Sequence, residues 1–385
     1  MALASRPQGT AAALTVALCI GNAVGDLSLN SQAAWVATLT RDRVLSTANV
    51  GWLACGEVLA SVAATLTLSI RRQLRFRSLV LTGAALATLA NAIAMFPAPS
   101  AVVLGRMLNG VGIGTLYATV NRLAATSPDA QRLFALMHAT GVGVSSAVYF
   151  ALPALIAYRG TAGLFGVMGS VAVVSMLVSA WGLRRAPSAP VQAANRRIPM
   201  RLAPSLACTG FMVVALGVSA VFTYVVTVGT AHGMPLRTVS TALAVTLPLA
   251  LIGPIAARIV GERWGLIAPL LTGLMLLSIA FFLIANASSA AFFAIAAGLL
   301  YFSVGFFPAY AMALVSSLDS SGRSAGVAGA FYLIGAASGP KIGGLFVEAA
   351  RFQTLAAVAA TCLAVGMALF RVAVWRNAIH ESVAR

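Results

Sequence analysis

Long apolar stretches, separated by short polar segments, follow one another along nearly the whole chain of 385 residues. A helix needs about 20 apolar residues to cross roughly 30 Å of hydrocarbon, and lipid offers its backbone amides no other partners. By this criterion the pattern predicts twelve membrane-spanning helices. We expect them at residues 11–34, 46–69, 78–96, 100–124, 132–157, 162–181, 204–228, 238–259, 266–285, 290–316, 325–348 and 352–375.

The longest polar break lies in the middle of this pattern and leaves six predicted spans on either side. It reads "GLRRAPSAPVQAANRRIPMRL" and is rich in Pro, Ala and Arg, a composition typical of a flexible connection. We therefore expect an all-α membrane protein with a six-helix bundle at 1–181, a cytoplasmic linker at 182–203 and a second six-helix bundle at 204–385. Two halves of equal span number favour a transporter whose binding site lies near the membrane midplane.

Composition and charge place the chain in the cytoplasmic (inner) membrane. Hydrophobic residues make up 60% of the chain and charged residues 9%, and the mean hydropathy of +0.94 lies outside the range of soluble domains. Most of the 25 basic residues fall in loops on one side if both termini are cytoplasmic, which is the asymmetry that orients membrane proteins. The net charge of +17 therefore indicates orientation rather than a nucleic-acid partner.

Tryptophan and cysteine positions are consistent with this interpretation. An indole suits the membrane–water interface, and all five tryptophans fall near predicted span ends: Trp35, Trp52, Trp181, Trp264 and Trp375. The four cysteines make no CxxC or Cys/His spacing, so we expect no disulfide, no metal site and no cofactor.

Two predicted spans are unusually rich in glycine, which lets helix backbones approach closely in lipid, where apolar burial does not drive helices together. The fourth span contains "GRMLNGVGIGTLYA", an R-x-x-x-G-x-G-x-G pattern formed by Arg106, Gly110, Gly112 and Gly114. The eleventh span contains a G-x8-G-x3-G-P-x2-G-G pattern formed by Gly326, Gly335, Gly339, Pro340, Gly343 and Gly344. We interpret these glycines as helix-packing sites.

These patterns resemble those of the major facilitator superfamily, which carries the first one in its fourth helix. The second is associated there with antiporters, but it normally belongs to the fifth helix and not the eleventh. The resemblance implies a fold of two six-helix bundles in which spans 1, 4, 7 and 10 line a central cavity. It also links Arg106 to proton coupling. On this basis the candidate substrate contacts are Asn22, Tyr117, Tyr224 and Tyr301, with hydrogen bonding between helices as the alternative role.

Acidic residues are few, and only Asp26 and Glu57 fall well inside predicted spans. A charged group at a span centre costs about 2.5 to 3.5 kcal/mol on insertion scales, so each is a candidate functional residue. A helical rise of about 1.5 Å per residue puts both at a depth similar to that of Arg106. A carboxylate that meets and leaves this arginine would act as a proton carrier. The alternatives are a static ion pair or a water-filled vestibule, and His138 ranks below Glu57 as a titrating group.

One lysine, Lys341, lies inside the eleventh span in "IGAASGPKIGGLFVEAA". An ammonium without an acidic partner in the second bundle would attract an anionic substrate group, together with Arg106. The alternative is that Lys341 extends toward the membrane surface and Glu348, two helical turns further on.

Together these observations predict a secondary transporter that moves a small organic solute, an organic anion, by proton-coupled alternating access. One alternative is a proton-driven exporter of hydrophobic or drug-like compounds, and a second is a non-transporting membrane receptor. An enzyme is not expected, because the three histidines are dispersed and no nucleotide-binding motif occurs. The expected partners are the small-molecule substrate, protons and the lipid bilayer, and we expect a monomer.

Overall fold

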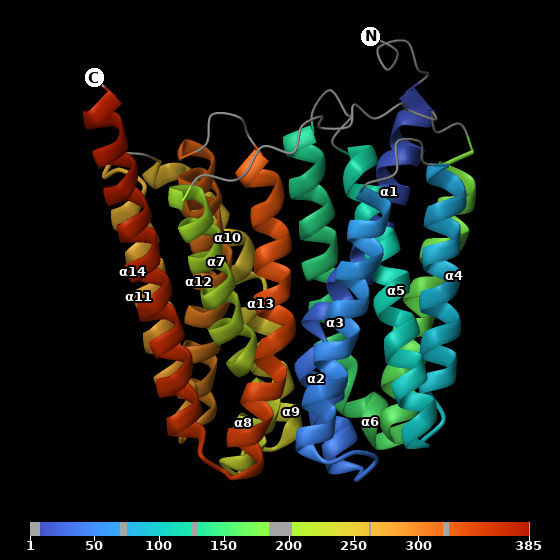
Figure 1. The fold of residues 1–385 in the computed structure, drawn as a ribbon. Helices are drawn as coiled ribbons and strands as arrows, with labels where there is room; N and C mark the ends of the chain where they lie inside the picture. Colours follow the sequence, from blue (N-terminus) through green and yellow to red (C-terminus); the bar gives the residue numbers. More distant parts are fainter. Residues whose placement is uncertain are drawn as a thin grey trace. The chain divides into compact units, whose positions relative to one another are not determined.

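The computed structural model describes residues 8–69, 75–124, 130–184, 202–261, 263–318 and 323–384, and these residues form helices and connecting loops (Figure 1). The chain divides into two compact units. The first consists of Met1–Ser46 and Gly56–Asn195, and the second of Thr47–Cys55 and Arg196–Arg385. One boundary between the units, after Asn195, falls inside the predicted linker 182–203. Residues 185–201 of this linker lie outside the described part of the chain. The assignment of Thr47–Cys55 to the second unit was not expected.

Most of the first unit is built from α1 (Gln8–Asn30), α2 (Gln32–Arg41), α3 (Thr47–Ser69), α4 (Phe76–Ala94), α5 (Pro99–Ala124) and α6 (Ala130–Gly182). In this unit α1 packs against α6, and α4 packs against both α5 and α6. Small apolar side chains such as Val80, Ala84 and Ala87 are fully buried at these contacts. The observed bounds follow the predicted spans to within a few residues, except that the predicted span 11–34 is divided between α1 and α2.

Helix α6 contains two of the predicted spans, 132–157 and 162–181, without a polar loop between them. Its regular geometry breaks at Gly160, where φ is 55° and ψ is −138°, a conformation that a side chain would strain. For this reason the described residues contain eleven apolar helical stretches long enough to cross a membrane, one of them the double-length Leu136–Gly182. Both arms of α6 reach one core cluster, because Met137 and Ala172 belong to it together.

The second unit contains α7 (Leu202–Phe222), α8 (Val225–Ala231), α9 (Leu236–Thr246), α10 (Leu249–Val260), α11 (Ile267–Ala285), α12 (Ala290–Ser317), α13 (Arg323–Glu348) and α14 (Phe352–Ala384). Helix α7 packs against α13 and α14, and α12 packs against α10 and α11. Two predicted spans appear as broken helices, α7 with α8 and α9 with α10. The second break occurs at Pro248, which has no backbone N–H to continue the helical hydrogen bonds.

The glycines of the fourth predicted span lie where α5 meets its neighbours. A Cβ at Gly110 would collide with the backbone of Glu57, and one at Gly114 would collide with the backbone of Ser61, both on α3. A Cβ at Gly112 would meet the backbone of α4, 2.9 Å from the carbonyl oxygen of Gly83. Only glycine permits these three approaches, which connect α5 to both helices.

A second set of glycines lies on α13, where this helix meets α7. A Cβ at Gly335 would collide with Met212, one at Gly339 with Leu216 and one at Gly343 with the carbonyl oxygen of Ala220. Pro340 and Gly344 lie beside them, next to the hydroxyl group of Tyr224. The eight predicted packing residues thus lie where α5 meets α3 and α4 and where α13 meets α7.

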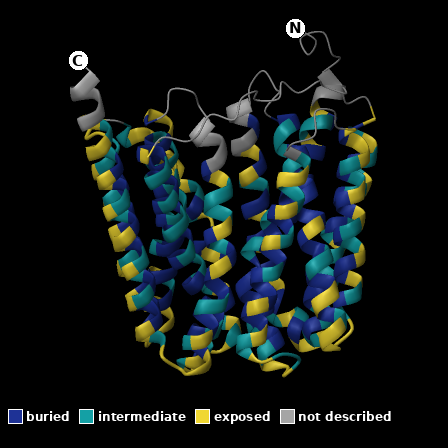
Figure 2. Ribbon diagram, in the orientation of Figure 1, coloured by how far each residue is buried: buried dark blue, intermediate teal, exposed yellow. Residues whose placement is uncertain are grey.

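Many exposed residues on the long helices are apolar (Figure 2). Examples are Leu89 on α4, Leu177 on α6, Ile255 on α10, Ile279 on α11 and Ile295 on α12. Large exposed apolar surface is unusual on a soluble monomer and fits helices that face lipid. Four of the five tryptophans are exposed as well, whereas Trp35 is fully buried within the protein.

Candidate functional site

A buried ion pair joins Glu57 of α3 to Arg106 of α5 within the first unit. Arg106 Nε donates to Glu57 Oε2 at 3.0 Å, and Arg106 Nη2 donates to Glu57 Oε1. The arginine side chain is 0% exposed and the glutamate side chain 3%. A guanidinium fork on both carboxylate oxygens is a strong and directional contact. The structure thus brings together two of the three residues predicted for proton coupling.

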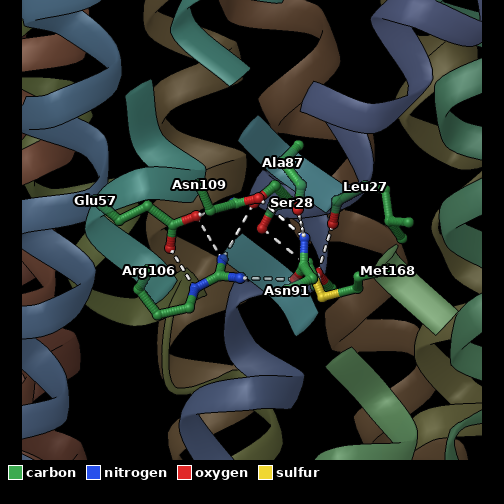
Figure 3. Close-up of polar contacts among 9 residues, drawn as sticks. Leu27, Ser28, Glu57, Ala87, Asn91, Arg106, Asn109 and Met168 are labelled. Carbon is green, nitrogen blue, oxygen red and sulfur yellow. Dashed lines mark hydrogen bonds and ion pairs between the residues drawn. The ribbon is translucent and has the colours of Figure 1, made fainter. Parts of the chain in front are cut away.

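Three polar side chains complete the network around this pair (Figure 3). Ser28 Oγ donates to Glu57 Oε1 at 2.9 Å, and Asn109 Nδ2 donates to the same oxygen at 2.7 Å. Asn91 Nδ2 donates to Asn109 Oδ1 at 3.1 Å, while Asn91 Oδ1 accepts from Arg106 Nη1 at 3.5 Å. The five residues come from α1, α3, α4 and α5, so one buried network connects four helices.

Two aromatic rings flank the guanidinium group of Arg106. Its Cζ atom lies 4.7 Å from the ring centroid of Trp35 and 5.4 Å from that of Phe165. A cation near the face of an aromatic ring is attracted to it, most strongly where water is excluded. The rings and the hydrogen bonds together hold the guanidinium in one place.

The pairing limits what Glu57 can do chemically. The guanidinium contacts both carboxylate oxygens, and removal of either partner would leave a buried charge without its partner. Of the two roles considered for Arg106, the geometry favours the fixed ion pair. Because Arg106 has no exposed surface, the structure also gives it no open position as a direct substrate contact.

Asp26 of α1, the third predicted coupling residue, belongs to a separate cluster. Its Oδ1 accepts a hydrogen bond from Tyr117 of α5 at 2.6 Å, and its Oδ2 accepts one from Asn22 Nδ2 at 2.8 Å. His138 Nδ1 on α6 lies 3.7 Å from Oδ2. Asn22 and Tyr117, which were predicted as substrate contacts, therefore bind the Asp26 carboxylate.

The Asp26 carboxylate lies directly against the backbone of α6. A Cβ added at Gly141 would collide with it, so glycine makes room for the carboxylate between the helices. The Asp26 side chain keeps 13% of its surface exposed, and the His138 side chain 50%. This cluster is thus more accessible than the pair formed by Glu57 and Arg106, and it contains two groups that can change charge.

The two tyrosines predicted in the second unit are both buried. Tyr224 donates its hydroxyl hydrogen to the carbonyl oxygen of Pro340 at 2.9 Å, which ties the end of α7 to α13. Tyr301 is 2% exposed, and its ring packs edge-on against Phe222 with the centroids 5.9 Å apart. In this structure both side chains serve contacts between helices.

Lys341 on α13 is partly exposed, and its ammonium lies 3.7 Å from the ring centroid of Trp52, within the second unit. Among the residues that the structure describes, no carboxylate oxygen lies within 4 Å of this ammonium. The alternative pairing with Glu348 is therefore absent from the structure.

The fold and the sequence together identify the family. The family model for the Major Facilitator Superfamily matches residues 18–340. The chain belongs to this superfamily. Two solved structures of the nucleoside transporter NupG, one of them of a mutant, share its fold with TM-scores of 0.73 and 0.71. They are 12% and 14% identical in sequence and match 94% of this chain and 99% and 98% of theirs. No curated protein sequence matches the chain.

Membership in the superfamily makes the chain a multi-pass membrane protein and a secondary transporter of a small solute, not an enzyme. The predicted all-α fold is confirmed. Sequence identities of 12% and 14% show the fold alone. Within the described residues no group of three His, Cys, Asp or Glu side chains could hold a metal ion.

Two members of the buried network of this superfamily transporter, Ser28 and Asn91, were not singled out from the sequence. Asn91 could have been, because an amide in the middle of an apolar span needs a hydrogen-bond partner. Ser28 gave no such signal, since a serine inside a helix can bond to its own backbone. His138 was named but ranked low, because its sequence position does not show that it meets Asp26.

Proposed function

We propose that this transporter moves a small organic anion across the cytoplasmic membrane by proton-coupled alternating access, and that it works as a monomer. The observation that carries the proposal is the difference between the two buried carboxylates of the first unit. Glu57 is held by a permanent cation, whereas Asp26 has no lysine or arginine within 4 Å among the described residues. We therefore assign proton binding to Asp26 and a fixed structural role to Glu57 and Arg106.

Protonation of Asp26 lowers the free energy of keeping its side chain away from water while the transporter changes conformation. An ionised aspartate at a span centre costs about 2.5 to 3.5 kcal/mol on insertion scales, and the neutral acid avoids this cost. The donors Tyr117 and Asn22 can hold the carboxylate while it is accessible to water. A proton bound to Asp26 neutralises it before the cavity closes, so conformational exchange becomes dependent on the proton.

Lys341 supports an anionic substrate. The Lys341 ammonium lies against the ring of Trp52, and no described carboxylate oxygen lies within 4 Å of it. A substrate carboxylate or phosphate group would supply the anionic partner that the described residues do not provide.

The proton step is tested with purified protein in proteoliposomes under an imposed pH gradient at zero membrane potential. We expect accumulation of a radiolabelled small organic acid that a protonophore abolishes. A panel with nucleosides and hydrophobic cations identifies the substrate class. Asp26→Asn should lower accumulation at least tenfold while exchange of substrate for substrate continues, because the variant keeps the shape of the side chain but cannot carry a proton.

Asp42→Asn is the matched control, since Asp42 lies outside the spans of the same unit. Partial burial acts to raise the pKa of Asp42, but hydrogen bonds from Thr161 and Arg41 outweigh it, and the pKa is lowered. Its carboxylate therefore stays charged, and the control should accumulate substrate as the parent does. Undiminished accumulation by Asp26→Asn would contradict the assignment of the carrier. Transport of hydrophobic cations alone would favour the exporter.

The substrate charge is tested separately at Lys341. Lys341→Gln should weaken binding of the anionic substrate at least tenfold, about 1.4 kcal/mol, measured by the substrate-dependent rise in melting temperature. Lys341→Arg should retain part of the affinity because it keeps the charge. Equal affinity in the parent and Lys341→Gln would rule out this lysine as the anion contact.

A further inference from the structure

The Asp26 cluster contains a second titratable group, His138, which no step described so far requires. Its Nδ1 atom lies 3.7 Å from Asp26 Oδ2, across the contact between α6 and α1. This separation is too long for a direct hydrogen bond but within the range of an ion pair. One water molecule, or a small rotation of the imidazole, would complete a path for a proton.

The side chains of His138 and Asp26 differ in how much of their surface is exposed. The His138 side chain is 50% exposed, whereas the Asp26 side chain is 13% exposed and has both oxygens engaged by Tyr117 and Asn22. The imidazole is therefore the more accessible of the two groups. This order of exposure is the one expected if a proton reaches Asp26 through His138.

The other groups around Asp26 cannot take this role. On α1 the nearest titratable neighbour is Cys19, whose thiol bonds to Thr140, and on α5 it is Tyr117, whose hydroxyl already donates to Asp26. Glu57 and Arg106, on α3 and α5, are bound to each other. On α2, Arg41 pairs with Asp42. Among the described side chains, His138 is the basic group within ion-pair distance of Asp26.

We propose that His138 is a proton relay for Asp26. This inference rests on the proposed function of Asp26 as proton carrier. The imidazole, with a hydrogen on Nδ1, takes a proton from a hydronium ion at Nε2 and becomes a cation paired with the carboxylate. The proton on Nδ1 then moves to Oδ2, which leaves a neutral imidazole and a neutral aspartic acid. Charge and protons balance at each step without another reactant.

The first test measures the pairing without transport. The melting temperatures of the parent, His138→Gln, Asp26→Asn and the double variant are compared between pH 5 and pH 8. We expect His138→Gln to lower the melting temperature more at pH 5.5 to 6.5 than at pH 8, because only the charged imidazole attracts the carboxylate. In the Asp26→Asn background this pH-dependent difference should disappear. An equal effect of His138→Gln in both backgrounds would overturn the pairing.

The second test measures the relay in proteoliposomes, using the substrate identified by the panel described above. His138→Gln should slow proton-driven uptake at least fivefold at pH 7.5, and lowering the external pH should recover much of the loss, because a higher proton concentration loads Asp26 directly. Exchange of substrate for substrate should stay near the parent rate. A pH profile that matches the parent would overturn the relay.

The control is His232→Gln, which changes a histidine at the end of α8. His232 Nδ1 lies 2.8 Å from the carbonyl oxygen of Val228, and its ring packs 5.4 Å from that of Phe352. This variant should leave the pH profile of uptake unchanged.

The two tests distinguish the proposed function from the proposed role of His138. Pairing in the melting data without proton-driven uptake contradicts the proposed function, whereas proton-driven uptake without pairing contradicts the role of His138.

Discussion

The first unit holds two carboxylates within its helices, Glu57 and Asp26, and their surroundings differ. Glu57 meets a guanidinium, an amide and a hydroxyl group, all almost fully buried. Asp26 meets a hydroxyl group, an amide and a half-exposed imidazole. The permanent cation makes the first cluster a fixed connection between helices. The second cluster contains no lysine or arginine within 4 Å of its carboxylate among the described residues.

The largest expected effect comes from breaking the fixed cluster. Glu57→Ala leaves the guanidinium of Arg106 buried and unpaired, so we expect it to destabilise the protein by about 3 to 5 kcal/mol. The measurement is the melting temperature and the monodisperse yield of the purified variant. If Glu57→Ala does not fold, Glu57→Gln provides the comparison, since it keeps the shape but removes the charge.

Two further variants, Arg106→Lys and Asp26→Ala, test whether the two clusters contribute differently to stability. Arg106→Lys keeps the charge but loses the two-point contact, so its loss of stability should be smaller than that of Glu57→Ala. Asp26→Ala should cost less than Glu57→Ala, because no permanent cation is left without a partner. Equal destabilisation by Glu57→Ala and Asp26→Ala would remove the distinction between the clusters.

A smaller effect is expected from Tyr117→Phe, which removes one neutral hydrogen bond from Asp26 and keeps the ring. We expect a stability loss of about 1 kcal/mol. Thermal denaturation of the purified variant measures this loss. Tyr149→Phe is the control, since its hydroxyl donates to the carbonyl oxygen of Asn30, away from Asp26.

The positions of the spans could be predicted from the sequence because the length of an apolar stretch is a one-dimensional property. Depth could be predicted for the same reason, and Asp26, Glu57 and Arg106 were expected at similar heights. Depth does not say which face of a helix a side chain occupies, and so the sequence did not separate Asp26 from Arg106. That choice depends on helix rotation and packing, which Gly110, Gly114 and Gly141 set through backbone contacts.

Trp35 is a second residue whose surroundings could not be predicted from the apolar pattern. Its position near a predicted boundary favoured the membrane interface. The chain turns at Ser31, whose hydroxyl donates to the carbonyl oxygen of Leu27 at 2.6 Å, and a new helix, α2, begins at Gln32. This turn places Trp35 against Arg106 inside the unit. The apolar pattern does not distinguish one long helix from two short ones that meet at a bend.

The break at Gly160 has a consequence for how the protein is made. A straight helix with the 53 residues of α6 would extend about 80 Å, well beyond the thickness of a bilayer, yet Leu133 and Leu183 pack in the same core cluster. The two arms therefore form a hairpin, and its turn carries the exposed Arg159 next to Gly160. We expect the two arms to enter the membrane during synthesis as one hairpin, because each packs against the same core cluster.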